Sequence, residues 1–170
     1  MTRAYVVMGV SGCGKSTIAE SLASAMGVPW LDGDSLHSEA NIAKMERGEP
    51  LTDEDRGPWL DRVGRRLASG EARIIACSAL KRAYRQRITG AAGIRVTFLF
   101  LDGAYEVLQK RMAARTGHFM PTTLLDSQLD TLERPGADED VIRVDIDQTP
   151  EEIVAEFLDA LGLKDPVRAG

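Results

Sequence analysis

The chain has 170 residues, which is enough for one domain with a sizeable hydrophobic core. Hydrophobic residues make up 44% of it and charged residues 28%, and the formal net charge is −5, so no general nucleic-acid surface is indicated. The first apolar run starts too early for a signal peptide, no stretch approaches bilayer-spanning length, and the two cysteines suggest no disulfide framework, so we expect a cytoplasmic protein without a membrane partner.

The first element with a specific chemical signature is a loop at residues 9–17, which read Gly-Val-Ser-Gly-Cys-Gly-Lys-Ser-Thr. The Walker A pattern G-x-x-x-x-G-K-[ST] is met by Gly9, Gly14, Lys15 and Ser16. An apolar run at 4–8 predicts a strand before the loop, and apolar residues near helical spacing predict a helix over 16–26. Because a strand, a glycine loop and a helix N-terminus make an anion site, the sequence predicts that the chain binds a nucleoside triphosphate.

The loop positions suit different parts of that ligand. Gly12 and Gly14 let backbone N–H groups turn inward around an anion without Cβ clashes. Lys15 brings a positive charge to the β- and γ-phosphates, and the Ser16 hydroxyl is placed to hold Mg²⁺. We expect the nucleotide to contact the whole loop, formed by Gly9, Val10, Ser11, Gly12, Cys13, Gly14, Lys15, Ser16 and Thr17.

The rest of the chain alternates strand-like apolar runs with helical patterns. Further strands are predicted at 29–31, 73–77, 96–101 and 141–144. Helices are predicted at 39–46, 59–69, 82–89, 105–115, 122–133 and 150–161. This alternation predicts βαβ units, and hence a single α/β domain over residues 1–170 with a parallel sheet and helices on both faces. Ligands of such sheets bind beyond the carboxyl ends of the strands.

Two carboxylates follow the second predicted strand, in the sequence Asp32-Gly33-Asp34. A carboxylate beside the phosphate loop can accept a proton from an incoming hydroxyl group. Arg56 and Lys81 lie on segments expected at the same edge and could clamp an anionic acceptor. Asp-Gly-Asp is also a frequent turn, but beside a phosphate loop we favour the catalytic interpretation. Most of the other basic residues, including Arg85, are interpreted as solvated helix faces.

Taken together, these blocks resemble the bacterial-type gluconokinases. The resemblance runs in order through almost the whole chain and rests on the phosphate loop and on residues 32–37, 41–45, 48–60, 77–85, 118–121, 127–129 and 132–135. It implies the P-loop kinase fold of shikimate and nucleoside monophosphate kinases, with a five-stranded parallel sheet of order 2-3-1-4-5. It also implies an acceptor-binding segment at about 34–60 and a mobile lid at about 115–122. Ser38 departs from the family pattern, which has proline there at the start of a helix.

The resemblance implies an ATP- and Mg²⁺-dependent transfer of the γ-phosphate to the 6-hydroxyl of D-gluconate, giving 6-phosphogluconate. It makes Asp34 the proton acceptor, and Asp32, beside Ser16, would order metal-bound water or share contacts with the substrate. The reverse assignment, with Asp32 as the base and Asp34 as a substrate-holding residue, stays open. The residues expected to contact gluconate are Asp34, His37, Lys44, Arg56 and Lys81. Those expected to contact ATP, besides the loop, are Arg111 and Arg115 from the lid and Thr149 and Pro150 near the adenine. Lys15, Asp34 and Arg115 would carry the catalysis.

Alternatives remain at several positions. His37 is equally a polar residue at the start of a helix, and Arg56 is alternatively an ion-pair partner of Asp53 or Asp55. Asp102 ends an apolar run like a Walker B aspartate, but we discount it because the fourth strand lies to the far side of the loop's strand. A same-fold kinase of shikimate or another hydroxy acid is a second function. A nucleotide-hydrolysing switch is a third, although it would normally carry an Asn-Lys-x-Asp element that this sequence lacks. The resemblance suggests a homodimer, but no residue pattern defines an interface.

Overall fold

The computed structural model describes residues 3–116 and 123–163, without the side chains of Arg115, Thr116, Thr123 and Leu124. In this part of the chain, five parallel strands form one sheet in the order β2-β3-β1-β4-β5. The strands are β1 (Arg3–Met8), β2 (Trp30–Asp32), β3 (Ile74–Ala76), β4 (Arg95–Asp102) and β5 (Val141–Asp145). The expected parallel sheet and its strand order are therefore confirmed.

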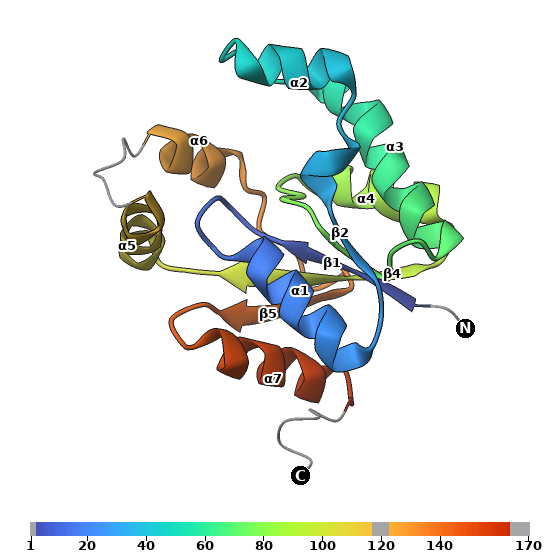
Figure 1. Cartoon of the computed structure of the whole chain (residues 1–170), viewed down its shortest axis with the longest axis vertical. Helices are drawn as coiled ribbons and strands as arrows, with labels where there is room; N and C mark the ends of the chain where they lie inside the picture. Colours follow the sequence, from blue (N-terminus) through green and yellow to red (C-terminus); the bar gives the residue numbers. More distant parts are fainter. Residues whose placement is uncertain (1–2, 117–122, 164–170) are drawn as a thin grey trace.

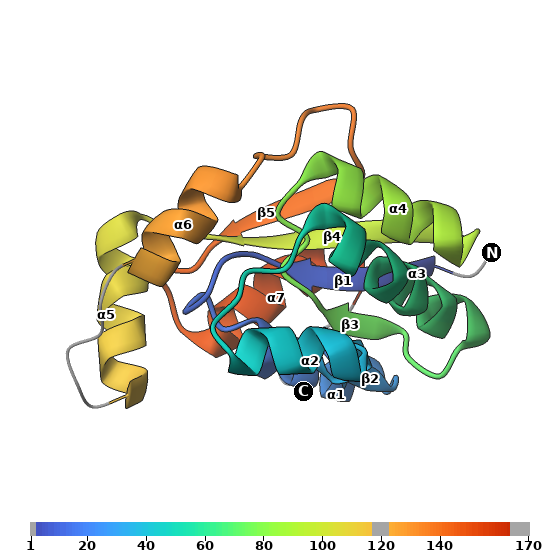
Figure 2. The same ribbon diagram turned by 90° about the horizontal axis from the view of Figure 1, so that it is seen from above.

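Helices cover both faces of this sheet (Figures 1 and 2). They are α1 (Lys15–Met26), α2 (Glu39–Glu46), α3 (Asp53–Ser69), α4 (Arg82–Ala92), α5 (Tyr105–Thr116), α6 (Thr123–Thr131) and α7 (Pro150–Ala160), with a 3₁₀ turn η1 (Gly33–Leu36) after β2. Helices α1 and α7 pack on one face and α3 and α4 on the other. Helices α5 and α6 lie beyond the carboxyl ends of the central strands, on the side of the loop that follows β1 (Figure 1). None of the described helices combines the length and apolar character needed to cross a bilayer.

The central strand shows why the sheet is covered on both faces. Side chains alternate along a strand, so neighbouring residues of β1 enter different cores. Tyr5 and Val7 pack in the cluster that contains α1 and α7, whereas Ala4, Val6 and Met8 pack in the cluster that contains α3 and α4. The continuous apolar run predicted as the first strand is thus a strand buried on both faces, as is usual in parallel sheets.

The largest difference from the predicted elements is the start of α3, which begins at Asp53 rather than at residue 59. The Thr52 hydroxyl accepts a hydrogen bond from the Asp55 N–H at 3.0 Å, and the Asp55 carboxylate accepts one from the Thr52 N–H at 2.9 Å. This capping box satisfies donors that a helix N-terminus otherwise leaves free. The Gly57-Pro58 pair therefore lies inside the helix. The other predicted elements are confirmed to within a few residues at their ends.

The departure from the family pattern at Ser38 has a local explanation. Ser38 precedes α2, and its hydroxyl accepts a hydrogen bond from the Asn41 N–H at 3.1 Å. Serine is a favoured N-cap residue because its side chain replaces a missing intrahelical partner. The chain thus begins α2 with a side-chain cap at the position where the resemblance led us to expect proline.

Candidate active site

The loop between β1 and α1 uses backbone conformations that favour glycine. Gly12 and Gly14 have φ values of 85° and 90°. A Cβ on Gly12 would lie 2.6 Å from Cγ of Met112 on α5, so a side chain there would be both strained and crowded. Gly14 immediately precedes α1, whose first-turn N–H groups have no intrahelical partners. Those N–H groups and the positive end of the helix dipole favour the binding of an anion at this loop.

A cleft of about 680 Å³ opens over the loop. From the loop and the start of α1, its lining residues are Ser11, Gly12, Gly14, Lys15, Ser16 and Thr17. Asp32 and Asp34 line it from the end of β2 and from η1, and Arg111 lines it from α5. The structure thus brings together most of the predicted nucleotide-binding residues and both carboxylates. Gly9, Val10 and Cys13 are not lining residues, and the side chains of Val10 and Cys13 are buried in the core.

Ser16 and Asp32, the two predicted metal ligands, are in direct contact. The Ser16 hydroxyl donates a hydrogen bond to Oδ2 of Asp32 at 3.0 Å. Hydroxyl and carboxylate oxygens are the ligand types that Mg²⁺ prefers. No group of three or more His, Cys, Asp or Glu side chains arranged for a metal ion occurs within residues 3–116 and 123–163, so a metal here would complete its shell with phosphate and water oxygens.

The two carboxylates of the Asp-Gly-Asp sequence have different environments. Oδ1 of Asp32 accepts a hydrogen bond from the Asp34 N–H at 3.0 Å, which is the turn-forming contact considered as the alternative interpretation. Asp32 therefore uses one oxygen for the turn and the other for Ser16. The Asp34 carboxylate is exposed in the cleft and accepts no hydrogen bond from any residue that the structure describes. Only Asp34 of this pair has both oxygens available to a ligand.

Trp59 and His37 hold the turn that carries Asp34. The indole Nε1 of Trp59 donates a hydrogen bond to the Gly33 carbonyl at 2.7 Å. The His37 ring stacks on Trp59 with 4.1 Å between the ring centres. Burial lowers the pKa of His37 below its usual value, so its imidazole is neutral at pH 7. His37 does not line the cleft, and its contacts favour the structural interpretation over a substrate contact.

The three basic residues predicted to meet gluconate lie outside the cleft. Lys44 pairs with Asp55 at 2.7 Å, and Lys81 pairs with Asp53 at 3.2 Å. Arg56, for which an ion pair with one of these acids was the alternative, instead donates a hydrogen bond to the carbonyl oxygen at residue 51 at 2.7 Å. Arg56 and Lys81 both lie over the ring of Tyr84, at 5.6 and 5.5 Å from its centre. The structure therefore gathers Arg56 and Lys81 around Tyr84.

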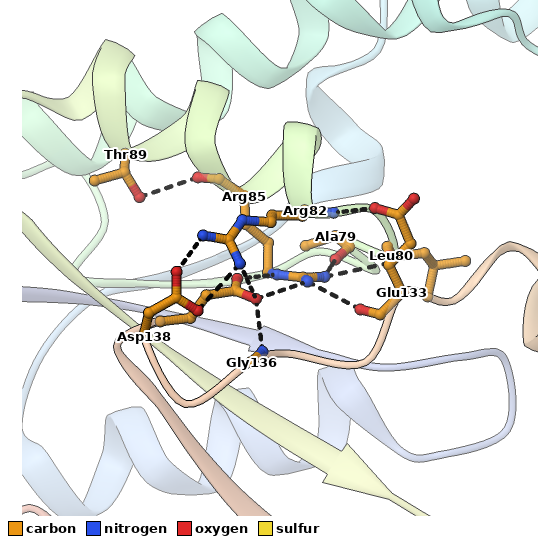
Figure 3. Close-up of polar contacts among 9 residues, drawn as sticks. Ala79, Leu80, Arg82, Arg85, Thr89, Glu133, Gly136 and Asp138 are labelled. Carbon is orange, nitrogen blue, oxygen red and sulfur yellow. Dashed lines mark hydrogen bonds and ion pairs between the residues drawn. The ribbon is translucent and has the colours of Figure 1, made fainter.

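Arg85 fixes the segment between β3 and α4 that ends at Lys81 (Figure 3). Its side chain is only 2% exposed, which corrects its interpretation as part of a solvated face. Its Nη1 donates to the carbonyls of Ala79 and Leu80 at 2.8 and 3.2 Å, and its Nε pairs with Glu139 at 2.7 Å. Ala79 has a φ of 47°, a conformation that costs free energy in a residue other than glycine. Arg85 is thus one reason why this segment keeps its shape.

On the nucleotide side, the predicted residue Arg111 lines the cleft from α5. Its guanidinium also donates hydrogen bonds to the carbonyls of Ile146 and Gln148, the latter at 3.2 Å. Thr149 caps α7 by accepting a hydrogen bond from the Glu152 N–H at 3.1 Å, and neither it nor Pro150 lines the cleft. The Arg115 side chain and the predicted lid from 117 to 122 lie outside the described residues.

Asp102, the Walker B candidate that we discounted, lies at the end of β4. Its side chain is 8% exposed and is engaged by Arg134 and Arg143. It is absent from the cleft lining. Asp102 therefore links β4, β5 and the segment after α6.

Sequence reasoning gave no role to Gln128, although it lies in one of the blocks that carry the family resemblance. Its Oε1 accepts a hydrogen bond from the Ser11 N–H at 2.6 Å, and it lines the cleft. Ser78, which follows β3, also lines the cleft. No spacing rule links α6 to the phosphate loop, so only a structure could reveal the hydrogen bond between Gln128 and Ser11.

The chain is similar to several known proteins. Residues 5–135 match the family model described as an AAA domain. A gluconokinase of Gluconobacter oxydans is 45% identical over 160 residues, covering 92% of this chain and 89% of that protein. The thermoresistant gluconokinase of Escherichia coli is 44% identical over 162 residues, covering 92% of each chain.

Solved structures agree with these matches. The crystal structure of a gluconokinase from Sinorhizobium meliloti has a TM-score of 0.87 and 50% identity, covering 95% of this chain and 92% of that one. A shikimate kinase from Aquifex aeolicus has a TM-score of 0.62 but only 19% identity, with coverage of 94% and 96%. The second likeness concerns the fold alone.

Proposed function

The chain belongs to the gluconokinase family, and from this premise we propose that it transfers the γ-phosphate of ATP to the 6-hydroxyl of D-gluconate. The products would be 6-phosphogluconate and ADP. The observation that carries the proposal is a single cleft that joins a phosphate-binding loop to an unengaged carboxylate, Asp34. A phosphoryl transfer to an alcohol needs these two features side by side.

The loop residues would bind and polarise the triphosphate. The N–H groups at the start of α1 would face the α- and β-phosphates, and Lys15 would reach the β- and γ-phosphates. The Lys15 Nζ donates to the carbonyl of Val10 at 3.3 Å, which holds it beside the cleft that Lys15 lines. Arg111 adds a second positive charge from α5. Fixed donors of this kind stabilise the charge that spreads over the γ-phosphate oxygens in the transition state.

Asp34 would orient the 6-hydroxyl of gluconate and accept its proton. The carboxylate lines the cleft on η1, a turn held by the hydrogen bond from Trp59 to Gly33. Positioning of the hydroxyl in line with the γ-phosphate would supply most of the acceleration, and the base would supply the remainder. Asp32, already bound to Ser16 and to the turn, is the weaker candidate for this role.

Ser16 and Asp32 would hold Mg²⁺ together with phosphate oxygens, because the Ser16 hydroxyl at the start of α1 lies 3.0 Å from Oδ2 of Asp32 at the end of β2. When bound there, Mg²⁺ would neutralise part of the charge on the β- and γ-phosphates. Arg56 from the acceptor segment and Lys81, which precedes α4, would contact the carboxylate and hydroxyl groups of gluconate. Because neither residue lines the cleft, this contact would require both of them to move toward the loop.

The test is a coupled assay of ADP release by the purified protein with gluconate, with shikimate and with no acceptor. We expect release only with gluconate, and a product that carries its phosphate on O6 by ³¹P and ¹³C spectroscopy. Lys15→Ala serves as the control: it should lower the rate about 10²–10³-fold with an unchanged circular dichroism spectrum. Equal ATP turnover with and without gluconate would indicate nucleotide hydrolysis instead. Faster turnover with shikimate than with gluconate would favour a kinase of shikimate or a similar hydroxy acid.

A further inference from the structure

Helix α6 contacts the phosphate loop through one side chain. Gln128 accepts a hydrogen bond from the backbone N–H of Ser11 across 117 positions of sequence, with 2.6 Å between Oε1 and the nitrogen. Both residues line the cleft, with Lys15 and Arg111. Figures 1 and 2 show α6 beside the loop that joins β1 to α1. The contact thus connects the helix that follows the predicted lid to the part of the protein that would hold the nucleotide.

The direction of this hydrogen bond determines which way the amide group of Gln128 is turned. A backbone N–H can only donate, so the atom that faces Ser11 must be the carbonyl oxygen of the side chain. The NH₂ group then points away from Ser11 with two hydrogens to donate. Because Gln128 lines the cleft, its NH₂ group could add a neutral donor to the charged ones of Lys15 and Arg111.

The position of Ser11 indicates which phosphate this donor would meet. The N–H groups from Gly14 onward surround the start of α1 and suit the α- and β-phosphates. Ser11 lies before them in the loop and directly follows Val10, whose carbonyl accepts a hydrogen bond from the Lys15 Nζ at 3.3 Å. Since Lys15 is the residue that reaches the β- and γ-phosphates, Ser11 lies on the γ-phosphate side of the loop. We propose that Gln128 is a positioning residue for the γ-phosphate: Oε1 holds the loop at Ser11 while the NH₂ group donates a hydrogen bond to a γ-phosphate oxygen.

This inference rests on the proposed kinase function, but it makes a prediction that does not need gluconate. A residue that contacts only the γ-phosphate affects the binding of a triphosphate and leaves a diphosphate unchanged. If Gln128 served only to anchor α6 on the loop, its loss would disturb the loop itself and weaken both nucleotides together. The ratio of the two affinities therefore separates a positioning role from a structural one.

The experiment measures the affinities of ADP and of β,γ-imido-ATP by calorimetry, with Mg²⁺ and without gluconate. The variants are Gln128→Ala and Gln128→Glu, and the matched control is Gln86→Ala, which removes an exposed glutamine from α4. We expect Gln128→Ala to weaken the imido analogue about tenfold while ADP binding stays within about twofold of wild type. Gln128→Glu keeps the acceptor for Ser11 but places a negative charge near the phosphate, so it should weaken the analogue further.

An equal loss of affinity for both nucleotides would overturn the proposal and leave Gln128 as an anchor, and unchanged affinities would remove it from the site. Gln128→Glu is nearly isosteric, so the measurement remains possible if Gln128→Ala folds poorly. Turnover with gluconate is measured in parallel. If wild type showed none, the proposed function would fail while the affinity ratio still decided the role of Gln128.

Discussion

The hydroxyl of Ser16 and the carboxylate of Asp32 share a hydrogen bond of 3.0 Å, which joins the first turn of α1 to the end of β2. Strand β1, which leads into α1, is not a neighbour of β2, since β3 lies between them. The contact therefore connects two segments at the carboxyl ends of the strands, where the proposed chemistry takes place. It places two oxygen ligands where a magnesium ion could also touch the phosphates of a nucleotide held by the loop.

Replacing Ser16 by alanine should raise the Mg²⁺ concentration needed for half-maximal activity, because one oxygen ligand is lost. A titration of Mg²⁺ at saturating ATP and gluconate measures this half-maximal concentration. Ser35→Ala is the control, since the Ser35 hydroxyl contacts the backbone carbonyl of Asp32 and not its carboxylate. If Ser16→Ala left the Mg²⁺ titration unchanged, Ser16 would not be a ligand.

Replacing Asp34 by asparagine should lower kcat about 10²–10⁴-fold while ATP affinity stays nearly unchanged. The substitution keeps the size of the side chain and removes the charge that would accept the proton. Steady-state kinetics of Asp32→Asn provides the comparison, because Asp32 already uses both oxygens in contacts with the protein. The assignment would be reversed if Asp32→Asn abolished turnover and Asp34→Asn mainly raised KM for gluconate.

Arg56→Lys should raise KM for gluconate about tenfold and change KM for ATP little. Lysine retains the charge but cannot form the two parallel hydrogen bonds that a guanidinium offers a carboxylate. The matched control is Arg66→Lys, on the same helix, which pairs with Glu71 on the surface. Michaelis constants of both variants for both substrates are the measurement. Wild-type constants with slightly lower stability would instead mark Arg56 as a structural residue that holds the carbonyl at residue 51.

Stability should depend on pH through Asp55, whose pKa is lowered from 3.8 to about 2, mainly by its hydrogen bond from Lys44. A carboxyl with a depressed folded-state pKa stabilises the protein above its unfolded-state pKa, and this contribution disappears as the pH falls through the folded value. The difference in denaturation midpoint between wild type and Asp55→Asn should thus be constant near pH 6 and shrink between about pH 4 and pH 2. Lys44→Met should show the same trend, because it removes the largest cause of the shift. A difference that stays constant down to pH 2 would contradict this assignment.

Arg85→Met should lower the free energy of unfolding by about 3–5 kcal/mol, because it leaves Glu139 without its buried partner. Arg87→Met on the same helix is the matched control. Its ion pair with Asp61 is exposed, so its loss should cost about 0–1 kcal/mol. Urea denaturation of the two variants measures the difference. If both variants lost a similar free energy of unfolding, the burial of Arg85 would not be what makes its ion pair important for stability.

Features that depend on neighbouring residues could be predicted from the sequence. The phosphate loop is encoded by adjacent glycines, Lys15 and Ser16, and the apolar periods of the flanking segments gave the strand before it and the helix after it. The start of α3 was missed although its capping residue, Thr52, is a local signal. This error therefore did not arise from information missing from the sequence.

By itself, then, the sequence determined the α/β fold, the strand order through its family resemblance, and the phosphate-binding loop. Only the tertiary structure decided that Arg85 is buried against Glu139, that Gln128 reaches Ser11, and that Asp32 is engaged while Asp34 is available. The first kind of information lies in the periodicity and turn chemistry of short segments. The second depends on which side chains meet after the helices have packed on the sheet, and in two of these contacts the partners are 54 and 117 residues apart. No local pattern encodes such distant pairs, because their contact is set by the packing of whole elements.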